Sequence, residues 1–134
     1  MTEARVEKVH ADRLGARTFL SQAEKFQRDA DAPALSSESR SVLLHNAVIS
    51  GCDAILQASG LRVTSGEGSH VLRLEAALAE IDQDTDDLLE RLDASRSRRS
   101  EASYAAGFVA QASVDEAREA TAELIELARV LVGA

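Results

Sequence analysis

The stretch that decides the fold class is SVLLHNAVISGCDAILQAS, from Ser41 to Ser59. Drawn as a helix, it is apolar over most of its circumference, which is typical of the central helix of a bundle. Its small residues would let a neighbouring helix approach closely; they are Ala47, Gly51, Ala54 and Ala58. The pattern predicts a helix from Glu38 to Ser59, capped by Ser37 and ended by Gly60.

The composition of the whole chain fits a helical domain built around this segment. The chain has 134 residues, of which 45% are hydrophobic and only 3% aromatic, so its core must consist mainly of alanine, leucine, valine and isoleucine. Alanine is the strongest helix former, and the single proline, Pro33, leaves long windows free for helices. Because this length is that of one domain, we expect residues 1–134 to form a single all-α domain.

Two other windows have the apolar spacing of helices. The first runs from Val6 to Ala30, and Asp31-Ala32-Pro33 ends it because the residue before a proline avoids the helical region. The second has apolar residues three and four positions apart and predicts one continuous helix from Val71 to Leu92, capped by Ser69. Its apolar seam could serve either the core or a contact between two copies of the chain.

The last third of the chain predicts a final helix and a short one before it. Ser113-Val114-Asp115-Glu116 has the spacing of a capping box, in which Ser113 accepts a hydrogen bond from the amide of Glu116. Residues 95–109 predict a short additional helix, and Gly60 to Gly68 predicts a loop. Short connections favour an up-down antiparallel bundle of four long helices plus this short one.

Three arginines within four positions stand out in an acidic chain. The net charge is -8, yet Arg96-Ser97-Arg98-Arg99 directly follows an acidic helix face. We call Arg96, Arg98 and Arg99 the arginine cluster. It favours binding of a phosphate or a carboxylate, with Arg98 and Arg99 as the main ligands and Arg96 in support. An alternative of equal weight is structural, because arginines here could pair with the acidic helix and complement its dipole.

Three passages together resemble a HEPN domain (higher eukaryotes and prokaryotes nucleotide-binding). They are the alanine-rich segment Val42 to Gly60, the segment Gly68 to Leu74, and the segment Leu92 to Tyr104 with the helix that follows. The resemblance covers about residues 40–132. It implies a bundle of four to five helices that forms a homodimer. It also implies a nucleotidyltransferase or antitoxin partner, in a toxin-antitoxin or phage-defence module.

Nuclease members of the HEPN family carry an arginine, four intervening residues and a histidine, and cleave RNA without a metal ion. In this chain Arg99 matches the arginine, but Tyr104 occupies the position of the histidine. An ordinary tyrosine titrates near 10, against about 6.5 for histidine, so it exchanges protons poorly at neutral pH. Because a tyrosine replaces the histidine of the nuclease motif, we expect a domain that is non-catalytic or weakly catalytic. Tyr104 would donate a hydroxyl hydrogen bond, accept a nucleotide as a modification site, or simply pack its ring.

The remaining candidates for a site carry weaker signals. Cys52 is the only cysteine, which excludes an internal disulfide and argues against a zinc site, and it is predicted to be a small buried hydrophobe. His45 is predicted to lie in the core, and His10, His45 and His70 share no spacing typical of metal ligands. The acidic run from Asp82 to Asp86 lacks the glycine of a calcium loop. We therefore predict no metal and no cofactor.

Charge and hydropathy also bear on partners and location. A net charge of -8 argues against non-specific binding to duplex DNA, which depends on many contacts between cations and phosphates. No apolar run is long enough to cross a membrane. The charged N-terminal segment lacks the apolar stretch of a signal peptide. We therefore expect a cytoplasmic protein that is not membrane-bound.

Three functions are compatible with the sequence. The first is a HEPN-like domain that is non-catalytic or weakly catalytic, acting through a partner protein or binding a nucleotide or RNA phosphate at the arginine cluster. The second is a metal-independent ribonuclease, with Arg99 stabilising charge and Tyr104 exchanging protons. The third is a helical interaction bundle without a ligand site, in which the arginines form only ion pairs.

Overall fold

A computed structural model describes the backbone of residues 2–104 and 109–133 and the side chains of residues 2–97 and 109–133. This part of the chain is mostly helical, which confirms the predicted class. Its elements, in order, are β1 (Val6–Lys8), α1 (Arg13–Asp29), α2 (Ser37–Ser59), β2 (Leu61–Val63), α3 (Ser69–Leu78), α4 (Asp86–Tyr104) and α5 (Gln111–Gly133). None of the helices described has the length and apolar character needed to cross a membrane.

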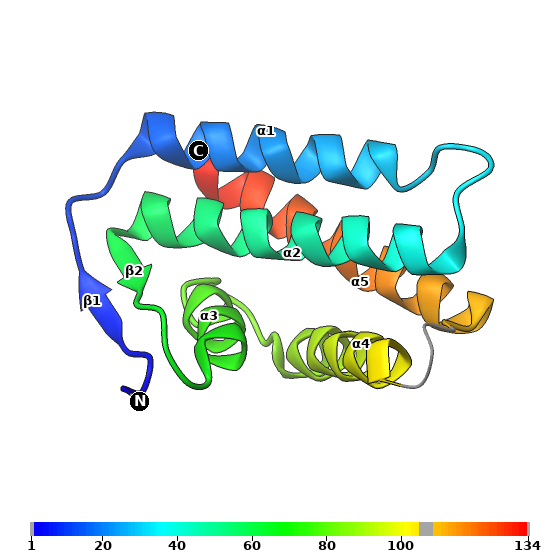
Figure 1. Ribbon diagram of the computed structural model, residues 1–134. Helices are drawn as coiled ribbons and strands as arrows, with labels where there is room; N and C mark the ends of the chain where they lie inside the picture. Colours follow the sequence, from blue (N-terminus) through cyan, green and yellow to red (C-terminus); the bar gives the residue numbers. More distant parts are fainter. Residues whose placement is uncertain (1, 105–108, 134) are drawn as a thin grey trace.

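Helix α2 lies at the centre of the fold, as its apolar circumference predicts (Figure 1). Its N-cap is Ser36, one residue before the predicted cap, and the Ser36 hydroxyl accepts a hydrogen bond from the amide of Ser39 at 3.1 Å. Gly60 ends the helix as predicted, with a φ of 72°. A side chain at Gly60 would also place its Cβ 2.9 Å from the carbonyl oxygen of Val9, so both conformation and space require glycine.

Small residues of α2 pack against the neighbouring helix α1. Ala54 packs with Ala16 of α1, and Ala47 packs with Ala23 of α1, in two fully buried clusters that α5 completes. These contacts confirm the prediction that α2 uses its small residues to bring a neighbouring helix close. The core is thus built from alanine and branched aliphatic side chains, as the low aromatic content requires.

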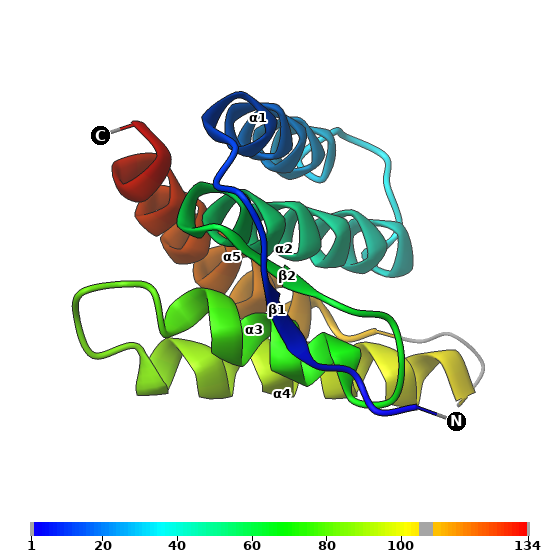
Figure 2. The same cartoon turned by 90° about the vertical axis from the view of Figure 1, so that its left-hand side faces the viewer.

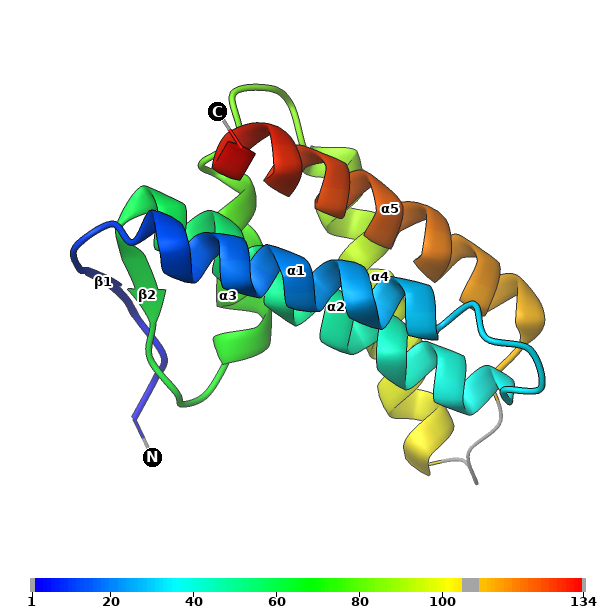
Figure 3. The same cartoon turned by 90° about the horizontal axis from the view of Figure 1, so that it is seen from above.

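The helices form two layers that cross. Helices α1 and α2 run antiparallel side by side, and α5 crosses them obliquely (Figures 1 and 3). Helices α3 and α4 run across α2 rather than alongside it, and Figure 2 shows this layer from the side. The predicted up-down antiparallel arrangement therefore holds for the α1–α2 pair but not for α3 and α4.

The N-terminal helix is shorter than predicted. It begins at Arg13, after the N-cap Asp12, whose carboxylate accepts a hydrogen bond from the amide of Gly15 at 2.8 Å. The residues before it form strand β1, which pairs antiparallel with β2, with Val6 opposite Val63. The segment predicted as a loop after Gly60 thus supplies the partner strand. Pairing with a distant segment overrides the helical pattern that Val6 and Val9 continue locally.

The predicted third helix is two helices joined by a turn. Helix α3 ends at Leu78, and α4 begins at Asp86. In the turn the Asp84 carboxylate accepts a hydrogen bond from the amide of Asp86 at 3.0 Å, the kind of local bond that competes with a continuous helix. Leu78 and Leu88 still lie in one buried cluster. The sequence predicts that the apolar seam serves either the core or a contact between two copies. In the structure it serves the core.

The last two helices also differ from the prediction at their ends. Helix α4 continues to Tyr104, so the predicted short helix over residues 95–109 is mostly its C-terminal half. Helix α5 begins at Gln111, and the amide of Ser113 donates to the carbonyl of Ala110 at 3.0 Å. The predicted capping box is therefore wrong, because Ser113 lies inside the first turn. Ser69 likewise begins α3 rather than capping it, and the N-cap is Gly68.

Replacing Ser36 by alanine is expected to lower the free energy of unfolding by about 1 kcal/mol, because the amide of Ser39 loses its acceptor. Ser113→Ala is the matched control. Its expected effect is under about 0.5 kcal/mol, because Ser113 does not cap its helix. Urea denaturation of both variants measures the difference. A loss at Ser113 as large as that at Ser36 would contradict these boundaries.

Candidate functional site

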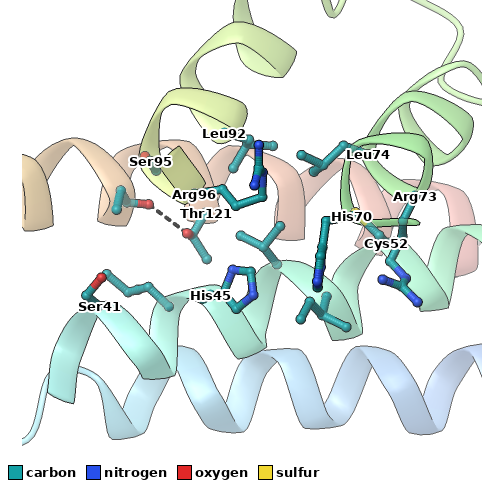
Figure 4. Close-up of a pocket in the computed structure, with 14 residues that line it drawn as sticks. Ser41, His45, Cys52, His70, Arg73, Leu74, Leu92, Ser95, Arg96 and Thr121 are labelled. Atoms are coloured by element: carbon teal, nitrogen blue, oxygen red, sulfur yellow. Dashed lines mark hydrogen bonds between the residues drawn. The ribbon is translucent and has the colours of Figure 1, made fainter. Parts of the chain in front are cut away.

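A partly open pocket lies between α2 and the layer formed by α3 and α4 (Figure 4). Its volume is about 40 Å³, room for a few water molecules. Its apolar walls include Leu44 and Val48 of α2, Leu74 of α3 and Leu92 of α4. Because Leu44, Leu74 and Leu92 are almost fully buried, the packed core sets the shape of the pocket.

The polar lining of the pocket is basic. Arg73 and Arg96 are its charged residues, and His45 and His70 add two imidazoles, whereas no Asp or Glu of the described residues lines it. The chain as a whole has 23 acidic residues against 15 lysines and arginines. A carboxylate-free pocket with two arginines therefore departs from the average surface and suits an anion.

The fold brings together two histidines that no sequence spacing connects. The ring centroids of His45, on α2, and His70, on α3, are 5.9 Å apart, and the ring planes are inclined by 50°. Figure 4 shows the two rings beside each other in the middle of the pocket. His45 is partly buried and borders this space, so it lies at the edge of the core rather than inside it. Two imidazoles at this separation can both reach one bound group.

Each pocket arginine is paired with an aspartate that does not itself line the pocket. Arg73 Nε donates to Asp53 Oδ1 at 3.2 Å. Arg96 donates from Nε and Nη2 to Asp93 Oδ1 at 3.2 and 3.1 Å. The side chains of Arg73 and Arg96 are only 21% and 28% exposed, which strengthens their attraction for an anion. Each aspartate thus holds a guanidinium whose other N–H groups can serve a ligand.

The pair on the α3 side is partly desolvated. Burial raises the pKa of the Asp53 carboxyl, and the charge of Arg73 opposes this increase. A pair of this kind adds little net stability, because desolvation offsets most of the attraction between the two charges. The main effect of the pair is therefore on position, because Asp53 restricts where the Arg73 guanidinium can lie.

Ser95 adds a hydroxyl without a partner to the α4 wall of the pocket. Its Oγ is buried and has no hydrogen-bond partner among the described residues. An unpaired buried hydroxyl costs about 1–3 kcal/mol, which a bound acceptor would recover. A second hydroxyl of the lining is already satisfied, because Thr121 donates to the carbonyl of Ala117 at 2.6 Å, drawn as the dashed line in Figure 4.

Among the residues predicted from the arginine cluster, Arg96 reaches the pocket. Its bond to Asp93 is also the ion pair within the acidic helix that the structural interpretation predicts. Arg98, Arg99 and Tyr104 belong to α4, but their side chains lie outside the described residues. Sequence reasoning missed six residues of the pocket's polar lining as site residues: Ser41, His45, His70, Arg73, Ser95 and Thr121.

Cys52 lines the pocket and is fully buried, as predicted. Burial raises the pKa of its thiol to about 12, with a further increase from the charge of Asp53 and a decrease from Arg73. The thiol is therefore protonated at neutral pH and acts as an apolar wall rather than as a nucleophile.

The buried thiol predicts a loss of stability at alkaline pH. In the folded chain Cys52 keeps its proton up to about pH 12, whereas an unfolded cysteine ionises near pH 8.5. Its stabilising contribution is complete below about pH 8.5 and is lost as the pH rises towards 12, by about 1–2 kcal/mol at pH 10. Urea denaturation at pH 7.5 and pH 10 measures this loss. Cys52→Ala should lose less stability over the same interval, and an equal loss would contradict the raised pKa.

Among the side chains described, those of residues 2–97 and 109–133, no three His, Cys, Asp or Glu converge as metal ligands. The predicted absence of a metal site stays a prediction for the whole chain. No protein-family model matches the sequence, and comparisons with curated proteins and with solved structures find no match either, so the site is interpreted from its own geometry.

Proposed function

We propose that this chain is a helical domain that binds the phosphate group of a nucleotide or an RNA in the pocket between α2, α3 and α4. The proposal rests on one observation, the set of residues that line the pocket. Two arginines and two histidines line it, and no carboxylate of the described residues does, in a chain whose net charge is -8. Guanidinium groups bind phosphate oxygens through paired, charge-assisted hydrogen bonds, and imidazoles add donors.

The position of the arginine cluster supports the same proposal. Arg96 borders the pocket, and Arg98 and Arg99 follow it on the same helix. The backbone of Arg99 is three residues further on, about 4.5 Å along the helix axis. The cluster therefore begins at the pocket, and the remainder of a nucleotide or RNA would leave along α4.

In its wider role, the chain is proposed to be a HEPN-like domain that is non-catalytic or weakly catalytic, as the sequence resemblance implies. It would form a homodimer and act with a nucleotidyltransferase or an antitoxin partner. A dimeric mass in light scattering would support this role, and a monomeric mass at micromolar concentration would argue against it.

A second candidate function is metal-independent cleavage of RNA. The observation that favours it is the pair of imidazoles 5.9 Å apart in a pocket that also holds Arg73 and Arg96. Such a pair can remove one proton and deliver another, while an arginine stabilises the charge that develops on the phosphate. In this scheme His45 and His70, rather than Tyr104, exchange the protons.

Calorimetric titration of the purified chain with inorganic phosphate at low ionic strength tests the main proposal. We expect saturable binding of one phosphate per chain, displaced by AMP. The absence of binding to both probes at millimolar concentration would overturn it.

Incubation of the chain with RNA in EDTA tests the second candidate, with His45→Ala/His70→Ala as the comparison. Cleavage that disappears in the double variant would establish it, and intact RNA would exclude it.

A further inference from the structure

We infer that the pocket receives a terminal phosphate, as in a nucleoside monophosphate or a phosphorylated RNA end, rather than an internal phosphodiester. This inference rests on the proposed phosphate-binding function and narrows its class of ligand. Three features of the pocket carry it: its size, the arrangement of its basic groups and the hydroxyl of Ser95.

The size of the pocket admits a phosphate group but not a nucleoside. Its volume is about 40 Å³, whereas pockets that enclose a whole drug-sized ligand hold roughly 300–1,000 Å³. Leu44, Leu74 and Leu92 belong to the packed core, so the walls cannot retreat without disturbing it. An internal phosphodiester has a nucleoside on each side, and both would have to lie outside the pocket. A terminal phosphate has only one.

The basic groups that line the pocket come from three helices. His45 belongs to α2, His70 and Arg73 to α3, and Arg96 to α4 (Figure 4). A terminal phosphate offers three free oxygens and a charge of about -1.5 to -2 near neutral pH. An internal phosphodiester offers two free oxygens and a single charge. Several donors on three helices therefore match the terminal group better.

The hydroxyl of Ser95 supplies a further donor beside Arg96. Its Oγ is buried on the α4 wall, with no partner in the described part of the chain. A phosphate oxygen in the pocket would accept a hydrogen bond from it. This bond exists only when the pocket is occupied, so Ser95 contributes to affinity without contributing to folding.

Calorimetry with three probes separates this inference from the function on which it rests. The probes are inorganic phosphate, AMP, and the trinucleotide ApApA with hydroxyl groups at both ends. ApApA has two internal phosphodiesters, so its charge resembles that of AMP. We expect AMP to bind at least tenfold more tightly than ApApA. Equal or tighter binding of ApApA would overturn the terminal-phosphate inference and leave phosphate binding intact. Failure of all three probes would overturn both.

Ser95→Ala tests the assigned hydroxyl directly. We expect the affinity for AMP to fall about 3- to 10-fold, with an unfolding midpoint in urea that is unchanged or higher, because the variant removes an unpaired buried group. Ser97→Ala, on the same helix but outside the pocket lining, is the matched control and should bind AMP like the original chain. Unchanged AMP affinity in Ser95→Ala, or an equal loss in Ser97→Ala, would overturn the role of Ser95.

Discussion

Replacing Arg96 by glutamine is expected to weaken the binding of inorganic phosphate by about 10- to 100-fold, the usual cost of losing a charge-assisted hydrogen bond in a partly buried site. The loss has two sources. The guanidinium that lines the pocket disappears, and Asp93, which bonds to Arg96 at 3.1 Å, is left as an uncompensated negative charge close to the anion. Calorimetric titration gives both dissociation constants.

Two control variants separate these sources from a general effect of charge. Arg96→Gln/Asp93→Asn removes both partners, so its affinity for phosphate should lie between those of the original chain and of Arg96→Gln. Arg91→Gln removes a positive charge from the same helix, where Arg91 pairs with Asp87 and Glu123 outside the pocket lining. It should leave the affinity almost unchanged. A loss in Arg91→Gln equal to that in Arg96→Gln would mean that the pocket is not the binding site.

Replacing Leu124 by alanine is expected to lower the free energy of unfolding by about 3–5 kcal/mol, because the change leaves a cavity in the packed core. Leu124 lies on α5, is fully buried and belongs to the core cluster that also contains Ile55 of α2 and Leu92 of α4. Opposite it, α2 has Gly51, which cannot fill the space. Urea denaturation measures the loss, and a value below about 1 kcal/mol would contradict the contact between α2 and α5.

Gly51→Ala is the companion variant for Leu124→Ala. A Cβ at residue 51 would lie 3.5 Å from the side chain of Leu124, an ordinary van der Waals distance. Alanine is also more stable than glycine inside a helix, by about 0.5–1 kcal/mol. The free energy of unfolding should therefore stay unchanged or rise. A marked loss would indicate that the two helices pack more closely than the structure describes.

The sequence predicts an element correctly where nearby residues alone determine its bounds. The span of α2 follows from its apolar circumference and from Gly60, whose left-handed conformation ends the helix. The break between α3 and α4 was missed because Ile81 and Thr85 continue the three-four spacing across the turn. The signal lay in Asp82 and Asp84, because the short side chain of aspartate competes for backbone hydrogen bonds, as that of Asp84 does here.

The small sheet and the pocket depend on contacts between distant segments. Val6 pairs with Val63, and each strand has only three residues, too few for an alternation of apolar and polar residues to predict a strand. His45 and His70 meet because α3 is turned across α2, a tertiary arrangement that no spacing within either helix predicts. Arg96 could be predicted because the three arginines of the cluster lie within four positions, whereas Arg73 is an isolated arginine on an amphipathic helix.

The most direct test of phosphate binding in this pocket is an NMR titration that follows the three imidazoles. His45 and His70 line the pocket, whereas His10 is exposed in the segment before α1 and serves as an internal reference. Added phosphate should shift the imidazole resonances of His45 and His70 along one saturation curve and leave those of His10 almost unmoved. Shifts of all three histidines that are equal and do not saturate would contradict a phosphate site between α2, α3 and α4.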